Sequence, residues 1–194
     1  QHILLSVKQK KILNLLRNEP VKLAHWVGFK DMNGLHNDWI KRFLFTKNDQ
    51  TLLAHRGSYK TTALSLFFAV HIILYPAENV IFFRKTDTDV AEIINQTLKI
   101  LYSGAVQEMV KTLYGVQLSV TKATANEINT NLNTSSKGAS QLVGLGITTS
   151  ITGKHADIVV TDDIVNIKDR ISRAERERTK TQYMELQNIV NRGG

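Results

Sequence analysis

One stretch of this chain constrains its fold more than any other: an apolar run, a loop of small residues, a lysine, a strongly apolar segment and a second apolar run. Thr51–Ala54 is typical of a short buried strand, Thr61–Leu74 of a helix that is apolar almost all round, and Asn79–Phe83 of a second buried strand. A strand, helix, strand order predicts parallel strands joined by a right-handed crossover. We therefore expect a three-layer α/β fold with a mainly parallel central sheet and helices on both faces.

Helical periodicity precedes this unit. It predicts one helix over Val7–Leu16, which Pro20 ends because the residue before a proline is pushed out of helical geometry, and a second helix over Leu35–Leu44. We expect residues 1–48 to form an amino-terminal helical extension and residues 49–194 to form the α/β core.

The segment after the second strand predicts further elements. A helix is expected over about Thr86–Tyr102, followed by a break at Gly115. The alternating runs Val116–Thr121 and Glu127–Leu132 favour a hairpin. The remaining expectations are a mobile polar loop over Asn133–Gly138, strands over Gln141–Leu145 and Ile158–Val160, and a helix that starts near Ser172, where Ser172 and Glu175 have capping-box spacing.

Composition narrows the class of protein. With 25 Lys and Arg against 17 Asp and Glu, the formal net charge is +8, which favours a polyanionic partner, with nucleic acid as the leading candidate. The chain has no cysteine, which excludes disulfides and thiolate metal sites. No apolar run approaches the roughly 20 residues needed to span a bilayer. We expect a soluble, intracellular protein, and the Gln1 start and Arg192-Gly-Gly194 end predict a fragment of a longer chain.

Lys60 lies where a strand-to-helix loop would bind phosphate. Such a loop gathers backbone amides at the positive end of a helix dipole, and a lysine there can hold the β and γ phosphates. Thr61 is placed where these sites use a hydroxyl to ligate magnesium. The strict pattern asks for glycine where this chain has Ala54 and Tyr59, and Tyr59 would meet a steric penalty in any glycine-like backbone conformation. The alternative interpretation is a tight turn before a buried helix.

Two adjacent acids, Asp162 and Asp163, follow the most apolar strand, Ile158–Val160. Asp162 is suited to hold a metal ion, directly or through water, and Asp163 to orient or deprotonate an attacking water. The alternative is that both acids merely solvate the strand end or cap the following turn. The loop and the acids together predict nucleotide hydrolysis.

Other polar and aromatic residues are weaker candidates. Arg84 and Lys85 follow the second strand at the edge where open α/β sheets bind ligands, so they could contact phosphate or DNA, or simply solvate the strand end. The histidines show no metal-ligand spacing, so a zinc site is not expected, and His71 in the apolar helix is predicted to be a core residue. Aromatic residues of the extension could stack on adenine, although helical spacing favours core positions; they are Trp26, Phe29 and Trp39.

These residues resemble the ATPase domain of the large terminase subunit of tailed bacteriophages, the motor that packages DNA into empty heads. The family has a deviant phosphate loop with an early arginine, and His55-Arg56-Gly57-Ser58-Tyr59-Lys60-Thr61-Thr62 is similar to it. Many members also end the acidic strand in Asp-Asp, after a segment similar to Gly153–Asp157. The similarity covers roughly Leu35–Gly194 and departs at Tyr59, where members usually have glycine.

The resemblance implies a P-loop NTPase core of the ASCE type that hydrolyses ATP with Mg²⁺, with residues 55–62 as the nucleotide-binding loop. It implies that Arg56 senses or stabilises the γ phosphate. It makes Lys154 a candidate to reach into a neighbouring subunit's site, and Arg84 and Lys85 are candidates as well; the alternative for Lys154 is a loop lysine that faces water. The implied partners are double-stranded DNA, a portal protein and a small terminase subunit, with a ring of subunits in the host cell cytoplasm. Members continue into a nuclease domain that this chain does not contain, so no DNA cleavage is expected of it.

Two alternatives stay open. A helicase-like nucleic-acid translocase shares the loop and the acidic strand but needs a second motor domain. A basic DNA-binding or assembly module could instead carry a nucleotide site that has decayed, which the substitution at Tyr59 would permit.

Overall fold

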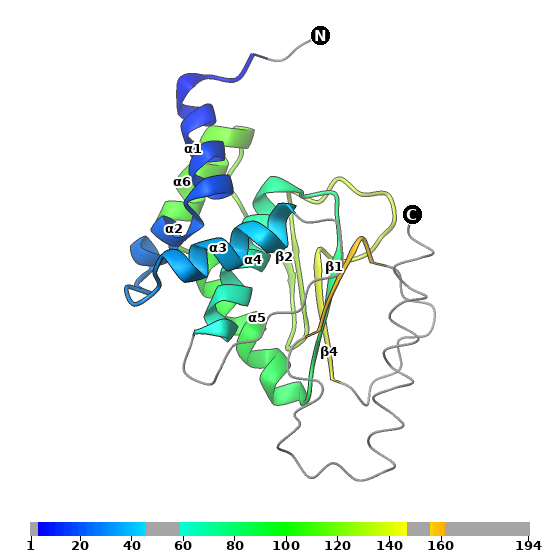
Figure 1. The fold of residues 1–194 in the computed structure, drawn as a ribbon. Helices are drawn as coiled ribbons and strands as arrows, with labels where there is room; N and C mark the ends of the chain where they lie inside the picture. The colour runs from blue at the N-terminus through cyan, green and yellow to red at the C-terminus, as the bar shows by residue number, and fades with distance from the viewer. Residues whose placement is uncertain (1–3, 46–58, 147–155, 162–194) are drawn as a thin grey trace, which may run out of the picture. The chain divides into compact units, whose positions relative to one another are not determined.

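The computed structural model describes residues 4–45, 59–146 and 156–161, which divide into two compact units (Figure 1). The helical unit takes in the described residues up to Tyr75 together with Asn95–Ser119. The sheet unit takes in Pro76–Ile94 and the described residues from Val120 onward. No helix in these ranges is long and apolar enough to cross a membrane. The predicted domain boundary between residues 48 and 49 and the predicted helix from Ser172 fall outside the described residues.

The helical unit is formed by elements whose ends follow from the sequence. Ser6 and Gln9 form a capping box at the start of α1, with distances of 3.1 Å and 2.8 Å between backbone nitrogens and side-chain oxygens. Pro20 begins α2, and Gly28 ends it in the left-handed conformation with φ of 114°. The unit comprises α1 (Val7–Asn18), α2 (Pro20–Val27), α3 (Gly34–Phe45), α4 (Lys60–Leu74), the last part of α5 (Asp87–Leu101) and α6 (Gly104–Tyr114).

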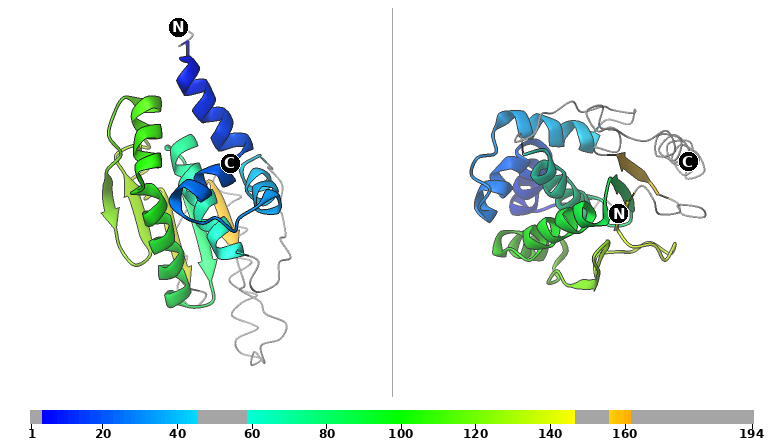
Figure 2. Two further views of the ribbon diagram at one scale, coloured as in Figure 1. Left: turned by 90° about the vertical axis from the view of Figure 1, so that its left-hand side faces the viewer. Right: turned by 90° about the horizontal axis from the view of Figure 1, so that it is seen from below.

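Helix α4 is the core of the helical unit. All twelve residues from Thr62 to Ile73 are buried, and α4 packs against α1, α2 and α3. The ring centroids of Phe43 in α3 and Phe67 in α4 lie 5.4 Å apart. Helices α1, α2 and α3 lie next to one another in both views of Figure 2. At the other end of α4, the hydroxyl of Tyr114 donates a hydrogen bond to the carbonyl of Ile73. The predicted helices in the extension and after Lys60 are confirmed.

Helix α6, like α2, was not predicted from the sequence. The hydroxyl of Ser103 accepts a hydrogen bond from the Val106 amide, and Gly115 ends the helix in the left-handed conformation. Val106, Met109 and Val110 are buried, and their spacing in the sequence places them on one face of the helix. This spacing and the serine cap could have predicted the helix.

The sheet unit has the strand order β2-β3-β4-β1-β5. Strands β4, β1 and β5 run parallel, whereas β2, β3 and β4 run antiparallel. The described sheet is therefore mixed and partly parallel: the predicted hairpin is formed by β2 and β3, and β3 pairs with β4 to extend the sheet in antiparallel orientation. The predicted strand over Thr51–Ala54 lies outside the described residues. The strands are β1 (Val80–Arg84), β2 (Val120–Ala123), β3 (Glu127–Thr130), β4 (Leu142–Gly146) and β5 (Ile158–Thr161).

The two faces of the central strands bury different residues. Phe82 and Gly144 are register partners, so they lie on one face, where Val90 of α5 also packs. A Cβ atom built on Gly144 would lie 2.4 Å from Val90 Cγ1 and 2.5 Å from Phe82 Cζ. Glycine is therefore required by close packing at this position. The opposite face holds a cluster of apolar side chains: Ile81, Phe83, Val143, Leu145, Ala156 and Val159.

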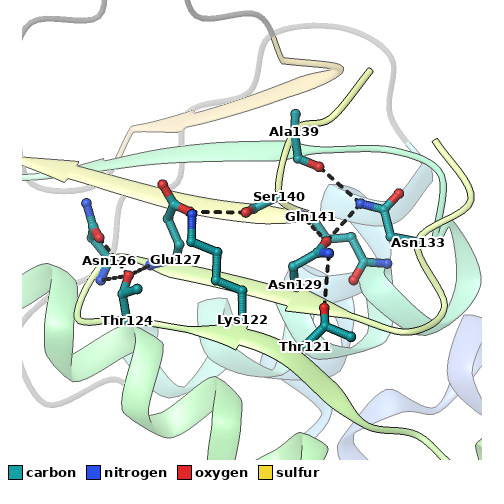
Figure 3. Close-up of polar contacts among 10 residues, drawn as sticks. All are labelled: Thr121, Lys122, Thr124, Asn126, Glu127, Asn129, Asn133, Ala139, Ser140 and Gln141. Atoms are coloured by element: carbon teal, nitrogen blue, oxygen red, sulfur yellow. Dashed lines mark hydrogen bonds and ion pairs between the residues drawn. The ribbon is translucent and has the colours of Figure 1, made fainter. Parts of the chain in front are cut away.

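A network of polar side chains fixes the hairpin and the loop after it (Figure 3). The side-chain amide of Asn129 donates a hydrogen bond to the Thr121 hydroxyl at 3.2 Å, and the side-chain amide of Asn133 donates one to Asn129 Oδ1 at 2.8 Å. Asn133 also donates to the Ala139 carbonyl at 3.0 Å and accepts from the Ser135 amide at 2.9 Å. The segment expected to be a mobile loop is a loop, and one asparagine side chain joins its two ends.

Candidate nucleotide-binding site

The structure describes some of the predicted site residues and not others. Tyr59, Lys60, Thr61 and Thr62 begin α4, and Arg84 and Lys85 follow in the sheet unit. The prediction that Lys60 lies close to Asp162 and Asp163 therefore stays a prediction. The candidates that lie outside the described residues are His55, Arg56, Gly57, Ser58, Lys154, Asp162 and Asp163.

Lys60 is the first residue of α4, as a phosphate-binding lysine requires. The preceding residue, Tyr59, has φ of 59° and ψ of 26° and is the one non-glycine residue with positive φ in the described ranges. This left-handed conformation costs about 1–2 kcal/mol for a residue with a Cβ atom. The expected steric penalty at Tyr59 is therefore present.

The Tyr59 side chain has specific partners. Its hydroxyl donates a hydrogen bond to Asp31 Oδ2 at 3.0 Å, and its ring meets the His36 ring edge-on at 6.1 Å between centroids. The hydrogen bond and the negative charge of Asp31 raise the pKa of the Tyr59 phenol. These partners lie 28 and 23 positions earlier in the chain, and no spacing rule in the sequence would have found them.

The two threonines in the first turn of α4 differ in their exposure to solvent. Thr61 is half-buried, whereas Thr62 is buried at 7% exposure. Of the two hydroxyls, that of Thr61 is therefore the more accessible to a ligand. One turn later, the buried Ser65 hydroxyl lies 3.0 Å from the Thr61 carbonyl and 3.2 Å from Gln96 Oε1 of α5. This contact joins the first turn of α4 to α5 within the helical unit.

The carboxyl ends of the parallel strands meet at one edge of the sheet unit. Arg84 is the register partner of Gly146, and Phe83 is the partner of Thr161. Thr161 directly precedes Asp162 in the sequence. Arg84, Lys85 and the end of the acidic strand therefore belong to the same edge, where ligands bind in open α/β sheets. Arg84 itself is buried at 7% exposure.

Acidic side chains also gather at the opposite, amino-terminal edge of these strands. The Asp157 carboxylate accepts a hydrogen bond from the backbone amide of Asn79 at 2.9 Å. The backbone carbonyl of Asn79 accepts one from the backbone amide of Asp157 at 3.0 Å. Partial burial, and then the charge of Asp157, raise the pKa of Glu78. These contacts join the starts of β1 and β5. Within the described ranges, no group of three potential ligands could hold a metal ion.

We expect Glu78→Gln to stabilise the protein at neutral pH. Because the pKa of Glu78 is raised on folding, the folded chain binds this proton more tightly, and stability falls as pH rises through the titration of Glu78. The gain should stay below about 1 kcal/mol because the carboxyl is partly exposed. Thermal unfolding at pH 7 should show a Tm higher by about 1–3 °C, with no difference near pH 4 or below. Glu92→Gln, an exposed change on α5, is the control, and a lowered Tm for Glu78→Gln at pH 7 would contradict the assignment.

The remaining candidates are largely structural. His71 is buried in α4 at 1% exposure, with the Phe67 and Tyr75 rings 5.8 Å and 5.2 Å away, so its prediction as a core residue is confirmed. Trp39 is buried at 7% exposure, and the ammonium group of Lys99 lies 5.1 Å from the Phe29 ring centroid. Trp39 is therefore a core residue, as its helical spacing predicts. Trp26 is 59% exposed, so the core position that helical spacing favours is not found for this residue.

Together these features define an α/β protein with a mixed sheet, amino-terminal helices and a lysine at the head of a buried helix. The protein family described as terminase large subunit, T4likevirus-type, N-terminal, matches residues 51–180. The chain therefore belongs to this terminase family, whose members are ATPases. No curated protein matches the chain.

Proposed function

We propose that this chain hydrolyses ATP with Mg²⁺ and that hydrolysis drives double-stranded DNA into a viral capsid. The observation that carries the proposal is the family match, which includes both the segment around Lys60 and the paired acids. The structure adds that Lys60 begins a helix of fifteen residues whose preceding residue supplies no side-chain cap. Amides at such an uncapped helix start favour an anionic ligand.

The residues in the proposed site fit a magnesium nucleotide. A hydroxyl and a carboxylate are hard oxygen ligands, which magnesium prefers, so Thr61 and Asp162 would hold the ion. Magnesium, when bound, would neutralise charge on the phosphate oxygens.

Each remaining residue has a proposed role of its own. Lys60 and the loop amides of residues 55–62 bind the β and γ phosphates, and Asp163 orients the attacking water. Arg56 stabilises charge on the γ phosphate. Lys154 reaches the site of a neighbouring subunit in a ring assembled on the portal protein. Lys85, which is exposed at the end of β1, contacts phosphate at the sheet edge.

The distribution of charge supports DNA as the polyanionic partner. Among the described residues, the helical unit has 11 Lys and Arg against 4 Asp and Glu, whereas the sheet unit has 4 against 6. The positive charge of the described chain is therefore concentrated in the helical unit. Lys8, Lys10 and Lys11 of α1 are exposed there and could neutralise phosphates of a DNA backbone. Besides DNA and the portal, the small terminase subunit is the proposed partner.

Calorimetry tests the nucleotide site directly. We expect the full-length subunit to bind a non-hydrolysable ATP analogue with a heat that requires magnesium, and to hydrolyse ATP faster when DNA is added. A decayed nucleotide site predicts no magnesium-dependent heat, and that result would favour a basic DNA-binding or assembly module instead. Translocation by a helicase-like mechanism would require a second ATPase-like lobe in the full-length sequence.

A further inference from the structure

Tyr59 combines a disfavoured backbone conformation with an exposed side chain. Its φ of 59° is one that glycine adopts freely, and the residue is 44% exposed. Burial in a core therefore does not hold this side chain in place. The contacts that oppose the backbone penalty come from its two partners, Asp31 and His36.

Asp31 lies in the turn between α2 and α3, and His36 lies in the first turn of α3; several contacts hold this part of the chain. The His25 Nε2 atom lies 2.6 Å from the Met32 carbonyl, and Met32 is 2% exposed. The Asn33 amide donates to His36 Nδ1 at 3.0 Å, and the His36 ring packs edge-on against Trp39 at 5.1 Å. Because the turn is held from both sides, Asp31 is presented to Tyr59 from a rigid support.

We propose that Tyr59 is a positioning residue for nucleotide binding, held by Asp31 in the glycine-like conformation that directs Lys60 toward the phosphates. The proposal rests on the nucleotide-binding function proposed above. A glycine would reach this conformation without help, whereas a tyrosine needs support to remain in it. The geometry at the head of α4 therefore depends on Asp31, a residue of the turn between α2 and α3.

This dependence gives a test that a purely structural role would not pass. In the full-length subunit, Asp31→Ala and Tyr59→Phe should each raise the Kd for a magnesium-bound, non-hydrolysable ATP analogue by about threefold to tenfold, the effect usual for one hydrogen bond. Asp31→Asn should stay within about twofold of the wild type, because its amide oxygen still accepts the phenol proton. Asp38→Ala, an exposed acid on α3, is the charge-matched control and should leave the Kd unchanged.

The decisive measurement repeats Asp31→Ala in a Tyr59→Gly background. Glycine needs no support, so the second change should then leave the Kd within about twofold of Tyr59→Gly alone. The positioning role is overturned if Asp31→Ala and Tyr59→Phe bind like the wild type, or if Asp31→Ala weakens binding equally in both backgrounds. A wild-type protein that binds no analogue would overturn the proposed function as well, so the two failures are distinguishable. Tm values measured on the same samples identify any variant that fails to fold.

Discussion

Replacing Lys60 with alanine is expected to abolish DNA-stimulated ATP hydrolysis in the full-length subunit. The proposed role of this ammonium group is to stabilise negative charge on the transferred phosphoryl group at the start of α4. Loss of one such stabilising group typically lowers kcat by about 10²–10³-fold. Steady-state hydrolysis assays with saturating DNA measure the effect.

The control for Lys60→Ala is Lys111→Ala, which removes an exposed lysine of α6. It should leave hydrolysis unchanged. Lys60→Arg keeps the charge but replaces a compact ammonium group with a planar fork, so activity should also fall. Full turnover by Lys60→Ala, with a wild-type Tm, would show that Lys60 does not act on the phosphates.

The largest expected effect on stability comes from Gly144→Ala. The added methyl group would lie 2.4 Å from Val90 Cγ1 and 2.5 Å from Phe82 Cζ, and both neighbours are only 1% exposed. Neither side chain can withdraw without disturbing the buried interface between α5 and the sheet. Overpacking of this kind costs about 3 kcal/mol, which lowers the Tm by about 6–12 °C for a chain of this size.

Two further variants isolate the cause of that loss. Val90→Ala, combined with Gly144→Ala, removes one of the clashing atoms and should restore part of the Tm. Gly104→Ala is the matched control, because nothing lies within 4 Å of the position of its new Cβ atom. If Gly144→Ala unfolds at the wild-type temperature, the close approach between Val90 and β4 is absent in solution.

The sequence predicted elements whose signals are local. Helix α4, strand β1 and the hairpin of β2 and β3 have strong periodicity, so their existence and type follow from neighbouring residues. The direction of the strands was harder to predict. The sheet is mixed because β3 pairs antiparallel with β4, and hydrophobic periodicity does not indicate which strands pair. Helix α6 was missed although its serine cap and apolar spacing were present.

The candidate site divides in the same way. The place of Lys60 at the head of α4 was predictable because a strand-to-helix loop has a recognisable order of residues. The support of Tyr59 by Asp31 was not, because the two residues are far apart in the chain and each is unremarkable alone. Long-range contacts of this kind require coordinates.

The length, pairing and charge of strand β2 affect whether copies of this protein associate at high concentration. Within the described sheet, β2 is the outermost strand beside β3, and such a strand offers unpaired backbone groups to other molecules. It has only four residues, its register shifts between Val120 and Lys122, and Lys122 forms an ion pair with Glu127. Short length, irregular pairing and a charged side chain each discourage intermolecular strand addition. Crowded subunits should therefore resist amyloid-like association along this border.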